Sequence, residues 1–176
     1  MRQKTETGLT AVLVDMQKGF IRENSHARLR KIISAQIDVI RGVCVSHDIP
    51  LIVLEYRGQG RTLEELEVEI SCVKRVVRLI KRVNDGFYDG KLEEVLHRFR
   101  TGRLLLMGIN ASFCVMETAG TAIELGYEIV TAHTLTTNTT SCSASKESDI
   151  SNALGWYERN GQVFKGTPTF EEIAQI

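Results

Sequence analysis

Short apolar runs alternate with segments of helical periodicity along the whole chain of 176 residues, and this alternation limits the possible folds more than any other feature. Most of the runs, such as AVLV and LIVL, are continuously apolar instead of alternating with polar residues. This pattern is typical of parallel strands that helices bury on both faces. We expect strands at Leu9–Asp15, Pro50–Tyr56, Val76–Ile80, Arg103–Ile109, Tyr127–Ala132 and Gln162–Lys165.

The segments between the runs carry apolar residues at helical spacing. Their four apolar stripes lie within Leu29–Cys44, Leu92–Phe99, Val115–Ile123 and Ile150–Tyr157. Thr62 and Glu65 are spaced as in a capping box and predict a short helix through Ile70. Strands and helices in turn predict right-handed crossovers, and hence a three-layer α/β/α fold with a six-stranded, Rossmann-like parallel sheet. No linker or internal repeat divides the sequence, so we expect a single domain over residues 1–176.

The charges of the chain balance, since Lys and Arg together number 22 and Asp and Glu together also number 22. A neutral chain has no bulk field that attracts phosphate backbones or anionic lipids, which argues against sequence-independent nucleic-acid binding. No uncharged apolar run is long enough to span a bilayer, and the N-terminal residues are typical of a first strand, not of a secretory signal. The 4 Cys are widely spaced, which predicts reduced thiols and a cytoplasmic location.

Three chemically complementary side chains follow predicted strands at the edge of the sheet where ligands bind. Asp15 ends the first strand, Lys81 comes directly after the third, and Cys114 follows the fourth across a short turn. Each also has an ordinary interpretation: an acid in a turn, a surface amine and a small buried residue. Three such residues at one edge shift the balance toward a catalytic site.

The chemistry of the trio is coherent. A thiol in the first turn of a helix lies at the positive end of the helix dipole, which favours the thiolate of Cys114, and a nearby Lys81 does so further. The free N–H groups there can donate to an oxyanion on a substrate carbonyl. Asp15 can take the thiol proton and return it to a leaving group, while Lys81 holds Asp15 in place. The trio therefore predicts nucleophilic catalysis by an ionised Cys114.

Three motifs resemble those of the isochorismatase-like cysteine hydrolases, and the match runs over nearly the full chain. VLVDMQKGF is similar to the family's first motif, IKRVNDGF to its lysine motif and GINASFCVMETA to its nucleophile motif. The resemblance implies a Cys–Asp–Lys catalytic set at Cys114, Asp15 and Lys81. It also implies a cis peptide bond at Ile109–Asn110, and an oxyanion hole formed by the backbone N–H groups of Asn110 through Cys114.

Further side chains are expected to bind the substrate around this set. They are Ile109, Asn110 and Phe113 of the nucleophile motif, Gln17 and Phe20 of the first motif, Phe87 of the lysine motif, and Tyr56 at the end of the second strand. Trp156 and Tyr157, on the last long helix, are expected in the core or in a subunit contact. The family resemblance suggests a homodimer or a higher homo-oligomer.

The chain departs from the family pattern at three positions. Family branches that hydrolyse nicotinamide hold a metal with acid and histidine residues after the second strand, where this chain has Glu55 and no His. The 4 His are scattered without ligand spacing, and the dinucleotide and phosphate-loop motifs are incomplete, so we expect neither a metal nor a cofactor. Asp85 stands where many members have Ser, and His133 where an acid is common, which bears on the choice of substrate.

These observations predict a hydrolase that cleaves a carbon–nitrogen bond of a small amide or carbamoyl compound through Cys114. One alternative is a non-catalytic or regulatory member of the family, against which rapid alkylation of Cys114 at neutral pH would argue. The other is hydrolysis of an enol ether, which needs Asp15 more than Cys114. The expected partner is a small-molecule substrate. The polar segment Thr134–Ser145 is expected to be a loop into the last long helix, or a mobile loop over the site.

Overall fold

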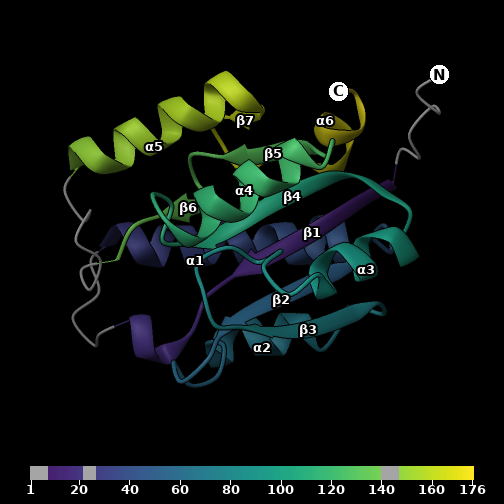
Figure 1. Cartoon of the computed structure of the whole chain (residues 1–176), viewed down its shortest axis with the longest axis horizontal. Coiled ribbons are helices and arrows are strands. Elements are labelled where there is room, and N and C mark those ends of the chain that lie inside the picture. Colours follow the sequence, from purple (N-terminus) through teal and green to yellow (C-terminus); the bar gives the residue numbers. More distant parts are fainter. Residues whose placement is uncertain (1–7, 22–26, 140–146) are drawn as a thin grey trace.

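A parallel sheet forms the middle of the molecule in the computed structural model, which describes residues 8–21, 27–139 and 147–176 (Figure 1). Its strands are β1 (Gly8–Val14), β2 (Leu51–Tyr56), β3 (Val76–Lys81), β4 (Thr101–Ile109), β5 (Glu128–Ala132), β6 (Thr136–Thr137) and β7 (Gln162–Phe164). They lie in the order β3-β2-β1-β4-β5-β7, with β6 paired to β4. All of these pairings are parallel, which confirms the predicted sheet type.

Helices cover both faces of this sheet. They are α1 (Ala27–Val39), α2 (Glu64–Ile70), α3 (Lys91–Arg98), α4 (Cys114–Glu124), α5 (Glu147–Asn160) and α6 (Phe170–Ala174), with a 3₁₀ turn η1 (Lys18–Phe20) and a π-helical turn η2 (Ile40–Val45) that continues α1. The first predicted apolar stripe runs through α1 and η2, the second lies on α3 and ends at Phe99 directly after it, and the other two lie on α4 and α5. None of the helices within the described ranges is long and apolar enough to cross a bilayer.

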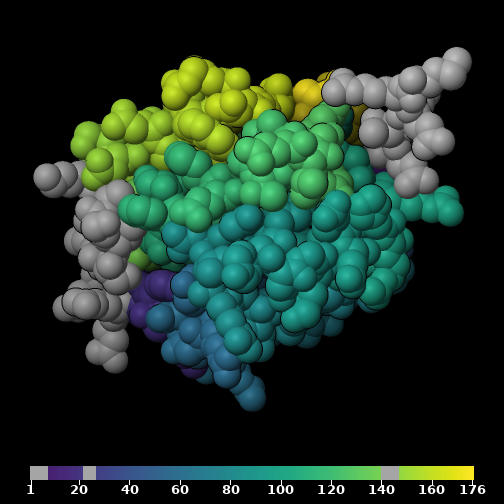
Figure 2. Space-filling view, in the orientation of Figure 1, coloured from purple at the N-terminus to yellow at the C-terminus, as the bar shows by residue number. Residues whose placement is uncertain are grey.

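Alternate residues of each central strand enter two separate apolar cores, as the pleat of a strand requires. On one face, Leu13 and Val53 pack with residues of α1, η2, α2 and α6. On the other face, Val12 and Leu54 pack with residues of α3, α4 and α5. Figure 2 shows the molecule from the side of α3, α4 and α5, which cover the second face. The predicted three-layer architecture is therefore confirmed.

Two local predictions differ from the structure. The sheet has a seventh, two-residue strand, β6, within the segment expected to be a loop. Such a short strand leaves no periodic pattern in a sequence, because its two residues pair only with the end of β4. The expected capping box at Thr62 and Glu65 is wrong. The residue that precedes α2 is Leu63, and the Thr62 hydroxyl donates to Glu55 instead.

The strand order reverses between β1 and β4. From β1 the chain builds β2 and β3 on one side, and it then crosses to β4 and continues through β5 and β7 on the other. Ligands of open parallel sheets bind beyond the carboxyl ends of the strands at this kind of switch point. Asp15 directly follows β1, and Cys114 follows β4 across four residues, so the topology places an acid and a thiol at the switch point.

Candidate active site

The three predicted catalytic side chains meet beyond the carboxyl ends of β1, β3 and β4. The Lys81 Nζ lies 2.8 Å from Asp15 Oδ2 in an ion pair. Both charged groups lie close enough to the Cys114 thiol to interact with it electrostatically. All three residues are buried, since Asp15 is 0%, Lys81 6% and Cys114 3% exposed. The structure thus brings together the acid, the amine and the thiol that the sequence places at the ends of three strands.

The backbone at the switch point is tightly packed around this group. Asp15 has a left-handed backbone with φ of 56°, and its N–H donates to Leu54 O at 2.9 Å. Lys81 Nζ also donates to Val83 O at 3.2 Å and lies 4.5 Å from the centre of the Tyr56 ring. These contacts hold the ammonium over Asp15 from several directions, because a buried charge needs both a counter-charge and hydrogen bonds.

Burial dominates the electrostatics of the acid and the thiol. Burial raises the pKa of Asp15, and the neighbouring Lys81 ammonium opposes this rise. Burial, together with the Asp15 charge, raises the pKa of Cys114 to about 12, although Lys81 lowers it. The expectation that Cys114 is ionised at rest is therefore wrong, because desolvation together with the Asp15 charge outweighs the Lys81 ammonium. Cys114 at rest is thus a thiol beside the Asp15 carboxyl group.

A fourth residue contacts the thiol, and the sequence analysis missed it. Asn84 Oδ1 lies 3.5 Å from Cys114 Sγ, and Asn84 Nδ2 donates to Glu117 Oε1 at 2.8 Å. Asn84 lies in the loop after β3, three residues beyond Lys81. An asparagine in a loop is common for turn geometry alone, so the sequence carries no signal for this contact.

The turn before Cys114 uses most of its amides internally. The peptide bond between Ile109 and Asn110 is cis. Ala111 N donates to Thr137 O at 3.0 Å, Ser112 N to Asn138 Oδ1 at 2.9 Å, and Phe113 N to Asn110 O at 3.0 Å. Within the described ranges, the N–H groups of Asn110 and Cys114 have no hydrogen-bond acceptor. The candidate oxyanion donors are therefore these two amides and not the whole stretch between them.

The residues around β6 hold this turn in place. Asn138 Nδ2 donates to the Ser112 hydroxyl at 2.8 Å, while its Oδ1 accepts from Ser112 N. The N–H and hydroxyl of Thr139 both donate to Asn110 Oδ1, at 3.2 and 3.0 Å. The first half of the predicted polar loop is thus hydrogen-bonded to residues 110–113, the turn before Cys114. Below, this turn is called the nucleophile turn, and its hydrogen bonds with the loop are called the clasp. Residues 140–145 of that loop lie outside the described ranges.

The side chains expected to bind substrate divide into two groups. Phe20 and Tyr56 contact each other edge to face, with ring centres 6.0 Å apart, and Tyr56 also adjoins Lys81. Phe113 is half-buried and directly precedes Cys114. In contrast, Ile109 is fully buried in one apolar core, and Phe87 lies in the other, 6.1 Å from the Tyr127 ring. These two side chains therefore support the site through packing, because their motif positions fall on core-facing backbone.

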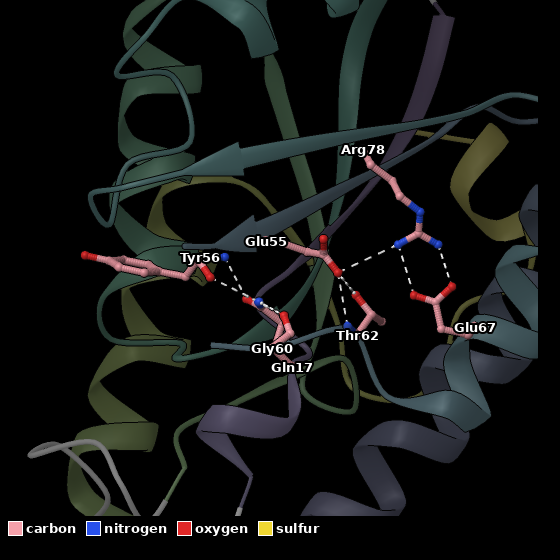
Figure 3. Close-up of polar contacts among 7 residues, drawn as sticks. All are labelled: Gln17, Glu55, Tyr56, Gly60, Thr62, Glu67 and Arg78. Carbon is pink, nitrogen blue, oxygen red and sulfur yellow. Dashed lines mark hydrogen bonds and ion pairs between the residues drawn. The ribbon is translucent and has the colours of Figure 1, made fainter. Parts of the chain in front are cut away.

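Gln17, also expected to bind substrate, is instead a clamp on the loop after β2 (Figure 3). Its Nε2 donates to Tyr56 O at 3.1 Å and to Gly60 O at 2.6 Å, and its Oε1 accepts from Tyr56 N at 2.6 Å. The side chain is buried and both of its donors are engaged. Its role in this structure is to hold Tyr56 in place.

The loop after β2 does not fit the metal site of some family branches. Glu55 Oε1 accepts from the N–H and the hydroxyl of Thr62, at 3.0 and 2.7 Å, and lies 3.8 Å from Arg78 (Figure 3). Arg78 is itself paired with Glu67 at 2.6 Å. Within the described ranges, no three His, Cys, Asp or Glu side chains cluster as metal ligands would. Glu55 therefore serves the loop structure.

The other departures from the family pattern are also structural. Asp85 Oδ1 accepts from Phe87 N and its Oδ2 from the Thr121 hydroxyl, both at 2.9 Å, so Asp85 joins its loop to α4. His133 Nε2 lies 2.9 Å from Glu158 on the surface. Tyr157 is buried, as expected of a core residue, and its hydroxyl donates to Ala111 O at 2.7 Å.

The molecule is thus a parallel α/β sheet with a buried thiol, acid and amine at its switch point, an arrangement suited to an enzyme with a site at the carboxyl edge of the sheet. Among solved structures, the nicotinamidase of Staphylococcus aureus resembles this chain with a TM-score of 0.74 at 18% identity, over 89% of this chain and 97% of that one. The N-carbamoylsarcosine amidase of Thermoplasma acidophilum does so with a TM-score of 0.75 at 18% identity, over 93% and 99%.

The MAR1 ribonuclease of Caenorhabditis elegans is similar to the same degree, with a TM-score of 0.76 at 20% identity, over 92% of this chain and 78% of that one. At identities of 18 and 20%, these similarities show that the chain shares the fold of the three proteins. No sequence among the curated proteins compared matches the chain. The isochorismatase domain model matches residues 10–154, a range that includes Asp15, Lys81 and Cys114. The chain therefore belongs to the isochorismatase family of hydrolases, as its motifs predicted.

Proposed function

We propose that this hydrolase cleaves a carbon–nitrogen bond of a small amide or carbamoyl compound, with Cys114 as nucleophile, Asp15 as proton carrier and Lys81 as its counter-charge. The observation that carries the proposal is the 2.8 Å ion pair of Lys81 with Asp15 beside the Cys114 thiol at the switch point. The similarity to a nicotinamidase and an N-carbamoylsarcosine amidase supports this class of bond.

The first step joins the sulfur to the substrate. Asp15 accepts the Cys114 proton as Sγ adds to the carbonyl carbon, so the S–H bond breaks while the S–C bond forms. Because the resting thiol has a raised pKa, proton transfer accompanies the attack instead of preceding it. The substrate oxygen becomes an oxyanion that accepts hydrogen bonds from the N–H groups of Asn110 and Cys114.

The second half of the reaction releases both products. Asp15 returns the proton to the leaving nitrogen as the C–N bond breaks, which leaves an acyl thioester on Cys114. A water molecule then attacks the thioester carbonyl while Asp15 accepts a proton from it. As the C–S bond breaks and the acid product leaves, Asp15 returns the proton to Sγ, which restores the thiol. Lys81 keeps Asp15 oriented and offsets its charge throughout, because an isolated carboxylate would be costly in a buried site.

Ammonia release from a panel of small amides and carbamoyl compounds tests this proposal. Cys114→Ala should abolish the release, with a loss of roughly 10³-fold or more, because it removes the nucleophile. Cys72→Ala is the matched control, since Cys72 is an exposed thiol that lies outside the trio, and it should keep full activity. Undiminished turnover by Cys114→Ala would rule out the thioester route.

The same variants separate the two alternatives. The name of the matching family model favours a test on an enol ether such as isochorismate. If Asp15→Asn loses that activity while Cys114→Ala keeps it, the enol-ether reaction holds, because it needs an acid and no thiol. If the native chain turns over neither the amides and carbamoyl compounds nor the enol ether, the regulatory alternative holds. Assembly into a homodimer or higher oligomer, and a cytoplasmic location, remain predictions from the sequence.

A further inference from the structure

Two hydrogen bonds join Cys114, Asn84 and Glu117, and the chemistry of these side chains determines which group donates in each bond. Asn84 has one acceptor end and one donor end, and a carboxylate such as Glu117 only accepts. Nδ2 must therefore face Glu117, where it donates at 2.8 Å, and Oδ1 must face the sulfur at 3.5 Å. Because Oδ1 only accepts, the sulfur has to be the donor. This arrangement suits an S–H group and disfavours a thiolate.

The position of Glu117 allows it to fix the orientation of the Asn84 amide. It lies in the first turn of α4, three residues after Cys114, so both side chains lie on one side of the helix. A carboxylate in a first turn is favoured by the helix dipole, so Glu117 places its acceptor oxygens at a favourable position on α4. With a neutral partner in its place, the Asn84 amide could turn over and present its NH₂ group to the sulfur.

We propose that Asn84, oriented by Glu117, is a positioning residue that keeps the resting Cys114 nucleophile protonated and hydrogen-bonded until a substrate displaces this contact. The inference rests on the proposed function, in which Cys114 is the nucleophile. For the attack, the S–H bond turns from Asn84 Oδ1 to Asp15, which takes the proton. The pair thus restrains a thiol that lies beside a ready base, and limits its reaction with other electrophiles.

Other groups that face the thiol must be considered with this pair. They are Asp15 after β1, Lys81 of β3 and the Tyr157 phenol of α5. Asp15 raises the pKa of the thiol and Lys81 lowers it. None of these side chains contacts Asn84 or Glu117 in the hydrogen bonds and ion pairs of the described ranges. Substitutions at Asn84 and Glu117 therefore leave those three groups in place.

A double-mutant cycle on the full chain tests the inference. The rate of iodoacetamide modification of the Cys114 peptide is measured by mass spectrometry at a fixed mildly alkaline pH. Asn84→Leu removes the acceptor at similar size, and Glu117→Gln removes the orienting charge at equal size. Each should speed alkylation by about 3- to 10-fold, the effect of losing one hydrogen bond to the neutral thiol. The double variant should be no faster than Asn84→Leu alone, because Glu117 acts only through Asn84.

Glu124→Gln, at the other end of α4, controls for loss of one negative charge and should leave the rate unchanged. Thermal melting confirms that each variant is folded, and Asn84→Ala replaces Asn84→Leu if the latter is not. Unchanged or slower alkylation in the Asn84 variant overturns the inference, and so do additive effects, which mean that Glu117 acts by charge alone. Loss of amide turnover in Cys114→Ala is a separate result, so failure of the proposed function and failure of this inference are distinguishable.

Discussion

Gln17 shows how one side chain can fix the geometry of a neighbouring loop. Its amide bonds to the N–H and the carbonyl of Tyr56 and to the carbonyl of Gly60. Tyr56 in turn lies against the Lys81 ammonium, so the Gln17 amide acts on the candidate site indirectly, through Tyr56. A residue of the first motif therefore contributes to the site by holding a side chain that contacts it.

Gln17→Leu should destabilise the chain by roughly 2 to 4 kcal/mol, because it leaves buried backbone groups of Tyr56 and Gly60 without a partner. Urea unfolding followed by circular dichroism measures the change. Gln175→Leu, on an exposed residue near the C-terminus, is the control and should stay within about 0.5 kcal/mol. Equal stability of the two variants would mean that the clamp is unimportant.

The raised pKa of Cys114, about 12, makes a separate prediction for its reactivity. As long as the pH stays below the pKa of such a group, its thiolate fraction rises about tenfold for each unit by which the pH increases. Alkylation of Cys114 in the free enzyme should therefore be slow at pH 7 and should climb steadily up to pH 10. Asp15→Asn should speed it, because the variant removes a negative charge that raises the pKa. A plateau reached below pH 8 would contradict the buried, protonated state.

Because Cys114 is protonated at rest, its alkylation rate does not distinguish a hydrolase from a regulatory member of the family. Slow alkylation at neutral pH no longer favours the regulatory alternative, because a catalytic thiol activated only during attack behaves in the same way. Turnover by the native chain and its loss in Cys114→Ala are the decisive measurements.

At the scale of elements, the approach of β4 to β1 positions the switch point. Gly108 has φ of 145°, and a Cβ at this position would lie 2.2 Å from Val14 O. Only glycine lets the two strands run this close where β1 passes into Asp15 and β4 into the nucleophile turn. The spacing of the acid and the thiol therefore depends on a residue without a side chain.

Gly108→Ala should cost roughly 3 kcal/mol or more, because the methyl group meets backbone and the φ is unfavourable for alanine. Gly120→Ala in α4 is the matched control, since a Cβ there meets nothing within 4 Å. The control should gain about 0.5 to 1 kcal/mol from better helix propensity. Thermal melts of the two variants should thus shift in opposite directions.

At the scale of the whole molecule, the last helix is tied to the nucleophile turn. Tyr157 of α5 is 1% exposed and donates to Ala111 O across the core that α3, α4 and α5 share. Residues far apart in the chain, from the turn after β4 and from α5, thereby fix each other. The loop around β6 also holds this turn, through Asn138 and Thr139.

Tyr157→Phe should lower the free energy of unfolding by about 1 to 2 kcal/mol, because it leaves a buried carbonyl unpaired. It should also reduce kcat on an active amide, since the turn carries both candidate oxyanion donors. Tyr88→Phe, at a tyrosine that is 76% exposed, should change neither quantity. A Tyr157→Phe variant that is as stable and active as the native chain would mean that α5 does not hold the nucleophile turn in place.

The sheet type, its central strands and the three layers were predictable because continuous apolar runs and helical stripes record burial on two faces. The edge position of Asp15, Lys81 and Cys114 was predictable for a related reason, since each follows a strand that the pattern identifies. The roles of Gln17, Asn84 and Phe87 were not, because they depend on which way a loop side chain turns. The ionisation of Cys114 was mispredicted because the depth of its burial arises only from packing across the sheet.

The clasp between the β6 loop and the nucleophile turn has a practical consequence for producing the protein. Asn110-Ala-Ser and Asn138-Thr-Thr both match the acceptor triplet for N-linked glycans. Both asparagines are nearly inaccessible, at 7% and 9% exposed, and both side-chain amides accept hydrogen bonds across the clasp. A sugar added before folding would keep the clasp from forming, so a host that does not attach such sugars is the one to use for expression.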